Sequence, residues 1–148
     1  MEDGLKLKGD VYITVKDKDG NVKEKRHEKN LVVSAGLNFI CDRMEGTSEA
    51  VMSHMGLGSG TTAVAAGNTD LESILGSREA LDSTTVSSNT ITYVSSFEAG
   101  DATGAVTEAA IFNASSSGTM LCRVVFAAIN KAAADTMSVT WVITLTAS

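Results

Sequence analysis

The sequence predicts an all-β protein, an antiparallel β-sandwich or jelly-roll-like domain with one short α-helix at about residues 34–45. The clearest observation is the segment 137–145, in which apolar and polar residues alternate with a period of two. One face of this segment carries Met137, Val139, Trp141, Ile143 and Leu145, and the other carries Ser138, Thr140 and Thr144. The 148 residues also include no proline, so every backbone N–H can join a β-ladder. We expect the sole tryptophan, Trp141, in the core with Val139, Ile143, Phe126 and Phe97.

The N-terminal residues predict a charged hairpin. Residues 5–16 alternate as a strand with Val11, Ile13 and Val15 on one face, and the Asp-Gly pair within 17–21 indicates a hairpin turn. The next strand, 22–29, is almost entirely charged, which suits a sheet edge that must not pair with other chains. We therefore expect a single domain over 1–148, with residues 1–30 as a charged hairpin and 31–148 as the main body.

A helix is predicted from Ser34, acting as N-cap, to about Glu45, with Gly46 as the C-terminal cap. Its apolar stripe should lie across a sheet and consists of Leu37, Ile40, Cys41 and Met44. Thr69 and Glu72 have the spacing of a capping box, which predicts a second, short helix through Leu75.

The remaining segments predict seven or eight strands in all. The expected strands after the first helix cover residues 51–57, 78–87, 89–97, 106–113, 119–127 and 137–145. The Ala-rich connection at 128–135 is long enough to predict a helical turn. The segment 56–62 is rich in glycine and is interpreted as a flexible loop.

Charge and cysteine usage limit the possible functions. The net charge is −6. Residues 1–30 carry a net charge of +1, and residues 31–148, with four basic and eleven acidic groups, carry −7. Such a chain is a poor nucleic-acid binder, because neutralising phosphates requires a basic stripe. Cys41 and Cys122 form no CxxC pair and are expected to be reduced, buried thiols. No signal peptide or membrane-spanning apolar segment is predicted.

Two segments resemble known binding loops but lack a residue that each loop requires. The Gly56–Gly60 segment lacks the third glycine of a GxGxxG loop, where Thr61 stands, so a flexible connector is favoured over a phosphate cradle. The spacing of Asp17 and Asp19 resembles a calcium loop, but Val22 occupies the position of its glycine. We therefore expect no catalytic, cofactor or metal site. A catalytic triad assembled from distant residues stays open, because sequence order does not reveal it.

Neither histidine has the neighbours of a metal ligand. His27 lies in the charged strand, and His54 lies between Met52 and Met55. No Cys, His or carboxylate stands at ligand spacing from either of them, so they are interpreted as ordinary surface and core histidines.

Three stretches resemble small structural proteins of tailed-bacteriophage virions. Gly56-Leu57-Gly58-Ser59-Gly60-Thr61-Thr62-Ala63 with Gly67-Asn68-Thr69-Asp70-Leu71 resembles the segment GxGTTAPxxGDTxL of phage tail and capsid accessory proteins. Thr107-Glu108-Ala109-Ala110-Ile111-Phe112-Asn113 with Gly118-Thr119-Met120-Leu121-Cys122-Arg123 resembles TEAGLFN…GTMLAR. Lys131 with Asp135-Thr136-Met137-Ser138-Val139-Thr140-Trp141 resembles K…DTLTVTW. Val64 and Ala110 stand where these patterns have proline and glycine.

The resemblance implies a virion structural protein and not an enzyme. The first expectation is a capsid decoration (cement) protein that stabilises the head shell, and the alternative is a tail component such as a baseplate, adaptor or fibre-attachment subunit. The protein would be assembled in the host cytoplasm, as a homodimer or homotrimer in contact with the major capsid protein or other virion subunits. The predicted interaction surface joins the glycine-rich loop and the charged hairpin, through Gly56, Gly58, Ser59, Gly60, Thr61, Thr62, Lys23, Lys25 and Arg26. The loop is expected to make the firm contact and to become ordered when bound.

Overall fold

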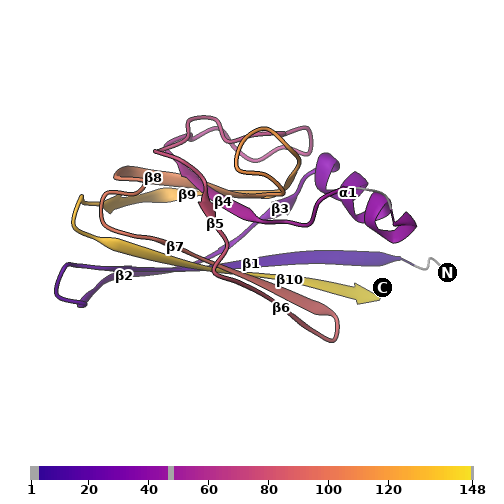
Figure 1. Ribbon diagram of the computed structural model, residues 1–148, viewed down its shortest axis with the longest axis horizontal. Coiled ribbons are helices and arrows are strands. Elements are labelled where there is room, and N and C mark those ends of the chain that lie inside the picture. The colour runs from indigo at the N-terminus through magenta and orange to yellow at the C-terminus, as the bar shows by residue number, and fades with distance from the viewer. Residues whose placement is uncertain (1–3, 47–48, 148) are drawn as a thin grey trace.

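Two five-stranded antiparallel sheets face each other in the computed structural model, which describes residues 4–46 and 49–147 (Figure 1). Sheet A has the order β2 (Val22–Lys29), β1 (Leu5–Lys16), β10 (Thr136–Ala147), β7 (Thr90–Phe97) and β6 (Ser83–Ser87). Sheet B has the order β3 (Leu31–Val32), β9 (Met120–Lys131), β8 (Gly104–Phe112), β4 (His54–Gly58) and β5 (Glu79–Ala80). The predicted β-sandwich with one short helix is confirmed.

The core lies between the two sheets and is centred on β10. Trp141 and Val139 are fully buried and stand opposite Val11 and Ile13 of β1, in a register that continues over all 12 residues of both strands. Alternate residues of β10 are buried, as its period-two pattern predicts. Phe97, Phe126 and Ile143 are also buried, so the predicted core residues are confirmed.

The charged hairpin is confirmed, and it forms one side of sheet A. The strands β1 and β2 have the predicted bounds, and Gly20 adopts the left-handed φ of 83° in the turn between them. The Asp17 carboxylate accepts hydrogen bonds from the N–H groups of Asp19 and Asn21, and these bonds hold the pKa of Asp17 below its usual range. Charged β2 is an edge strand, as its sequence indicates.

The helix α1 (Ser34–Glu45) has the predicted bounds, and Gly46 caps it with a left-handed φ of 85°. The predicted N-cap is wrong: Val33 occupies that position and no side chain caps the helix. The predicted apolar stripe is wrong for three of its four residues, since Met44 is 83% exposed, Leu37 is 43% exposed and Cys41 is exposed, while Ile40 packs against the core.

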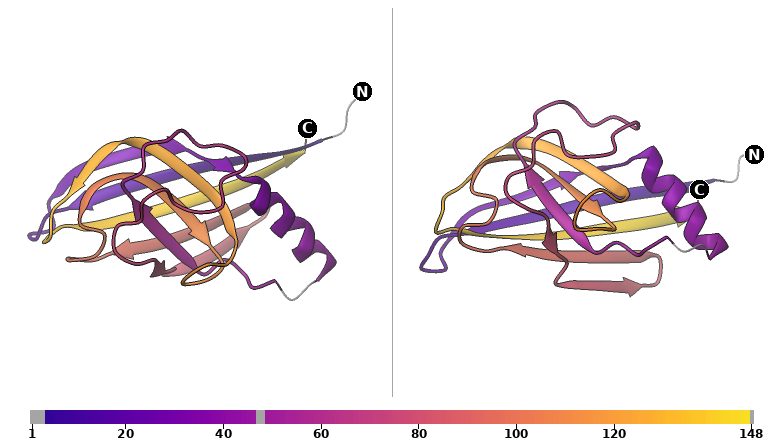
Figure 2. Two further views of the ribbon diagram at one scale, coloured as in Figure 1. Left: turned by 90° about the horizontal axis from the view of Figure 1, so that it is seen from above. Right: turned by 45° about the horizontal axis from the view of Figure 1, so that its top comes forward.

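A different face of α1 is buried, the one that carries Gly36 and Phe39. A Cβ atom built on Gly36 would meet the backbone carbonyl of Leu121, so the glycine lets the helix lie directly on β9. The helical period of 3.6 predicts the helix, but it does not determine which of two overlapping stripes lies against a sheet. The helix lies at one end of the sandwich in all views (Figures 1 and 2).

Four other predictions about local structure are wrong. Residues 69–76 form no helix, and β9 continues to Lys131, so the 128–135 segment holds no helical turn. The predicted strand at 78–87 is divided into β5 in sheet B and β6 in sheet A. The described residues contain ten strands, more than the seven or eight expected, because two of them have only two residues each. No helix among the described residues combines the length and apolar character needed to span a bilayer.

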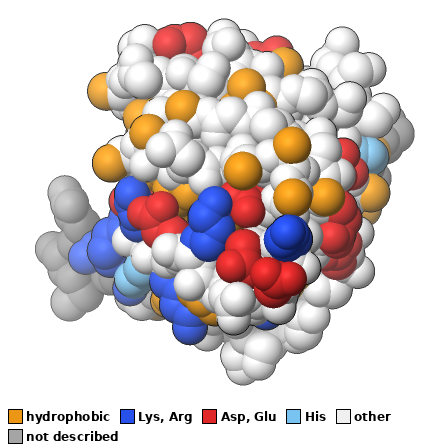
Figure 3. Space-filling model, turned by 90° about the vertical axis from the view of Figure 1, so that its left-hand side faces the viewer, with side chains coloured by type: hydrophobic (Ala, Val, Ile, Leu, Met, Phe, Trp, Pro, Cys, Tyr) orange, Lys and Arg blue, Asp and Glu red, His pale blue; other side chains and the backbone are white. Residues whose placement is uncertain are grey.

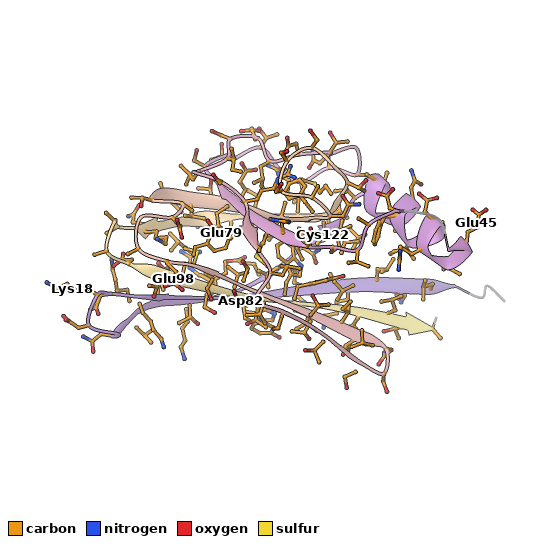
Figure 4. The ribbon with its side chains drawn as sticks, in the orientation of Figure 1. Lys18, Glu45, Glu79, Asp82, Glu98 and Cys122 are labelled. Carbon is orange, nitrogen blue, oxygen red and sulfur yellow. The ribbon has the colours of Figure 1, made fainter. Side chains whose placement is uncertain are left out.

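The two cysteines differ in exposure. Cys122 lies inside the molecule (Figure 4) and is buried, and desolvation raises its pKa well above the usual value. Cys41 is exposed, so the prediction of two buried thiols is wrong for this residue.

This difference predicts stepwise thiol labelling. At neutral pH the native protein should react rapidly with a thiol reagent at Cys41 alone, because a buried thiol is inert. In denaturant both cysteines should react, and a Cys41→Ser variant should show no rapid native reaction. Rapid native labelling of Cys122 in that variant would contradict the burial seen here.

Candidate functional site

The predicted interaction loop does not stand free of its own domain. Gly56 and Gly58 belong to β4 and are buried, and Gly60 is buried directly after it. These three glycines of the predicted interaction surface are therefore not accessible to a partner. Ser59, Thr61 and Thr62 are exposed.

The segment 60–73 is held by hydrogen bonds to the carboxylate of Glu108, a fully buried residue of β8. Its Oε1 atom accepts hydrogen bonds from the backbone N–H groups of Gly60 (3.1 Å) and Ser73 (2.8 Å). Its Oε2 atom accepts one from the N–H of Glu72 (3.0 Å). One side chain thus connects both ends of the 60–73 segment.

Arg123 of β9 is the counter-ion of Glu108. Its Nη2 and Nε atoms donate to Oε2 of Glu108 at 2.8 Å and 3.0 Å, and both side chains are almost completely buried. Its Nη1 atom donates to Oδ1 of Asn68 (3.0 Å), which also accepts from the N–H of Ala65 (2.9 Å). Burying a charge is costly unless it is paired and hydrogen-bonded, and here both partners are satisfied.

Glycine is required where the loop passes over this ion pair. A Cβ atom on Gly58 would lie 2.4 Å from Oε1 of Glu108, and one on Gly60 would lie 2.7 Å from the same atom. Thr107 also donates from Oγ1 to the carbonyl of Gly60 at 2.6 Å. The glycines therefore serve a close approach of backbone to carboxylate, and not flexibility, which corrects the interpretation of this segment as a flexible connector.

The same network explains why residues 69–76 form no helix. Ser73 accepts a hydrogen bond from Ser59, and Leu75 donates one to Leu57, so this segment lies alongside the end of β4. Glu72 does not cap a helix: its carboxylate accepts hydrogen bonds from the Thr62 hydroxyl and the Thr61 N–H. These bonds hold the pKa of Glu72 below its usual range.

A second cation, Arg78, fastens the serine-rich loop 114–118. Its guanidinium lies 3.4 Å above the ring centre of Phe112, which is a cation–π contact. Its Nη1 atom donates to the carbonyls of Ala114 (2.9 Å) and Ser117 (2.8 Å). The sequence alone does not identify Arg78, Glu108 and Arg123 as anchors. Glu108 and Arg123 nevertheless lie in the stretch that resembles TEAGLFN…GTMLAR.

The predicted cations of the hairpin are partly engaged within the chain. Lys23 forms an ion pair with Asp135, and this contact, with the Ala132 N–H, holds the pKa of Asp135 below its usual range. Arg26 pairs with Glu24 and donates to the carbonyl of Ala127 (3.1 Å), which connects the edge of sheet A to β9. Lys25 is exposed.

The hairpin end of the molecule carries many charged side chains. Figure 3 shows Lys, Arg, Asp and Glu side chains gathered over the lower half of this end. The hairpin and the glycine-rich loop belong to different sheets, since β2 is the edge of sheet A and β4 lies in sheet B. Among the described residues, the hydrogen bonds and ion pairs of Lys23 and Arg26 go to other parts of the chain and not to the glycine-rich loop.

The histidines belong to local contacts. His27 stacks on Tyr12 with ring centres 4.5 Å apart, and its Nε2 atom lies 2.9 Å from the Asp10 carboxylate. His54 shares a hydrogen bond with the neighbouring Ser53 hydroxyl. In the described part of the chain, no group of three or more His, Cys, Asp or Glu side chains is arranged to hold a metal ion.

The Glu108–Arg123 centre is therefore a buried anchor that holds the backbone of the 60–73 segment in place. Chemically it can hold backbone in place and offer the hydroxyls of Ser59, Thr61 and Thr62 to a partner. Comparison of the chain with models of protein families, with curated protein sequences and with solved structures finds no match.

Proposed function

We propose that this protein is a structural component of a tailed-bacteriophage virion, a capsid decoration protein bound outside the major capsid shell and without catalytic activity. One observation carries the proposal: the two longest stretches that resemble phage virion proteins, 56–71 and 107–123, meet around the carboxylate of Glu108. In this chain the resembling stretches thus form a buried hydrogen-bond network that holds a surface loop. A fixed surface loop is useful to a structural protein whose role is to bind other subunits.

The ordered loop suits a cement role. A decoration protein bridges capsomers and adds buried area across each junction, so that the shell resists the pressure of the packaged DNA. A loop whose backbone is already held by Glu108 loses little conformational entropy when it binds. We accordingly propose that the exposed Ser59, Thr61 and Thr62 contact the major capsid protein, without a disorder-to-order transition.

Location on the particle tests this proposal directly. Virions of the phage that encodes the protein should carry it in many copies over the head, as visualised with gold-labelled antibodies or by electron cryo-microscopy. A few copies at the tail would instead favour a baseplate, adaptor or fibre-attachment subunit. Absence of the protein from purified virions would refute a virion role.

The contact surface is tested with a matched pair of variants. Ser59→Tyr adds bulk to the exposed loop, and Ser138→Tyr adds the same bulk to an exposed position on β10. Both variants should melt close to the wild type, since neither serine is buried. Only Ser59→Tyr should lose binding to particles that lack the protein, measured by co-sedimentation. Wild-type occupancy by Ser59→Tyr would show that the loop is not the contact.

A further inference from the structure

The four edge strands of the described sheets differ in how well they are protected against pairing with a strand of another chain. At the edges of sheet B, β3 and β5 have two residues each, which is too short to recruit another strand. In sheet A, β2 is covered with charge, and its pairing with β1 is interrupted by a register shift at Val15. The opposite edge, β6, reads Ser-Thr-Thr-Val-Ser, carries no charge, and has all five residues exposed.

The unprotected edge is firmly held and not frayed. All five residues of β6 pair with β7 in an unbroken register from Ser83↔Val94 to Ser87↔Thr90. The turn that follows is tied to β10, because the Asn89 side chain donates to the carbonyl of Leu145 (2.9 Å) and Leu145 donates back to Asn89 (2.9 Å). Figures 1 and 2 show β6 at the border of the molecule with no element beyond it.

An apolar hollow lies beside this edge. It has a volume of about 320 Å³ and is lined by Phe39, Arg43, Val51, Met52, Thr84, Ile91 and Tyr93. Thr84 and Val86 pair with Tyr93 and Ile91, so they stand on the same side of sheet A as the hollow. Val86 is 69% exposed and Val51 is 60% exposed. A strand added to β6 would extend sheet A along this hollow and bury Val86.

We propose that β6 pairs with β6 of a second copy, in antiparallel orientation about a twofold axis at Thr85, to join two A sheets into one. The edge is self-complementary in this register: Thr84 of each copy stands opposite Val86 of the other, and Thr85 stands opposite Thr85. These are β-branched, uncharged pairs, which favour strand association. A twofold interface uses the same patch on both copies, as a single unprotected edge requires.

The charge distribution predicts how salt should affect this association. The chain carries a net charge of −6, so two copies repel at long range, while β6 itself presents no charge to its equivalent. Raising the salt concentration should therefore strengthen the association, since salt screens the long-range repulsion. A complex with a basic partner would weaken under the same change.

Charge substitutions at Thr85 test the proposal on the purified full-length chain by sedimentation velocity. The wild type should dimerise as its concentration is raised. Thr85→Lys and Thr85→Glu each place like charges opposite each other at the axis and should each weaken the dimer by at least about tenfold. An equimolar mixture of the two variants should restore dimers, because Lys then faces Glu. Ser138→Lys, at an exposed position of β10, is the matched control and should dimerise like the wild type.

Melting curves from circular dichroism should show all these variants folded, and the mixture reports pairing even if one variant is less stable. Three outcomes overturn the proposal: a wild type that stays monomeric at every concentration, a Thr85→Lys protein that dimerises like the wild type, and a mixture that stays monomeric. Capture of a different protein by β6 of a monomeric wild type also overturns it. Because the measurement uses the chain alone, its result is independent of the proposed virion role.

Discussion

Replacing Glu108 with alanine is expected to lower the free energy of unfolding by about 3–5 kcal/mol, since breaking a buried ion pair leaves an uncompensated charge. The change leaves the guanidinium of Arg123 without its counter-ion and the N–H groups of Gly60, Glu72 and Ser73 without their acceptor. A domain has only about 5–15 kcal/mol of stability in total, so this is a large fraction of it. Urea unfolding followed by Trp141 fluorescence measures the change.

Glu72→Ala is the matched control, because this carboxylate belongs to the same loop and is exposed. It should alter stability far less than Glu108→Ala. Limited proteolysis should also cut within 60–73 faster in Glu108→Ala than in the wild type or the control, since the loop loses its anchor. A Glu108→Ala protein within about 0.5 kcal/mol of the wild type, the range of ordinary surface substitutions, would show that the ion pair does not hold the loop.

Replacing residues 58–65 with a Gly-Ser linker should, for the same reason, lower the melting temperature. The linker removes part of the network on Glu108 and Arg123, including the Ala65 contact to Asn68. The sequence alone predicts that this replacement abolishes particle binding but leaves the melting temperature nearly unchanged, because a loop rich in Gly, Ala and Thr has little side-chain mass to pack in its own domain.

Trp141→Ala is expected to cost about 3–5 kcal/mol, the usual range for removing a large aromatic side chain from a core. Trp141 is fully buried on β10, opposite Val11 of β1 and Tyr93 of β7, so the cavity would open at the centre of sheet A. Urea unfolding followed by circular dichroism measures the loss. Iodide should quench the native fluorescence of Trp141 poorly.

Trp141→Phe should cost less than Trp141→Ala. It keeps an aromatic ring, and the indole nitrogen that it removes has no hydrogen-bond partner in the described structure. Val142→Ala, on the outer face of the same strand, is the position control and should cost less than either Trp141 variant. Free quenching of Trp141, or a Trp141→Ala loss no larger than that of Val142→Ala, would contradict the packing described here.

Local patterns in the sequence determined three long strands, the turn between the first two and the bounds of the helix. Period-two alternation placed β1 and β10, and the Asp-Gly pair placed the turn between β1 and β2. Gly46 marked the end of α1 correctly. Charge on β2 indicated a sheet edge. Each of these signals lies within a few residues of the feature that it predicts, so the sequence expresses it directly.

Only the tertiary structure decided the face of α1, the path of residues 69–76 and the role of the glycine-rich loop. All three depend on distant partners: Gly36 meets Leu121, and Glu108 meets Gly60, Glu72 and Arg123. The capping-box spacing at Thr69 and Glu72 is a weak local preference, amounting to about 1 kcal/mol. It yields to a buried carboxylate that must satisfy its hydrogen bonds, because leaving that charge unpaired costs several times more.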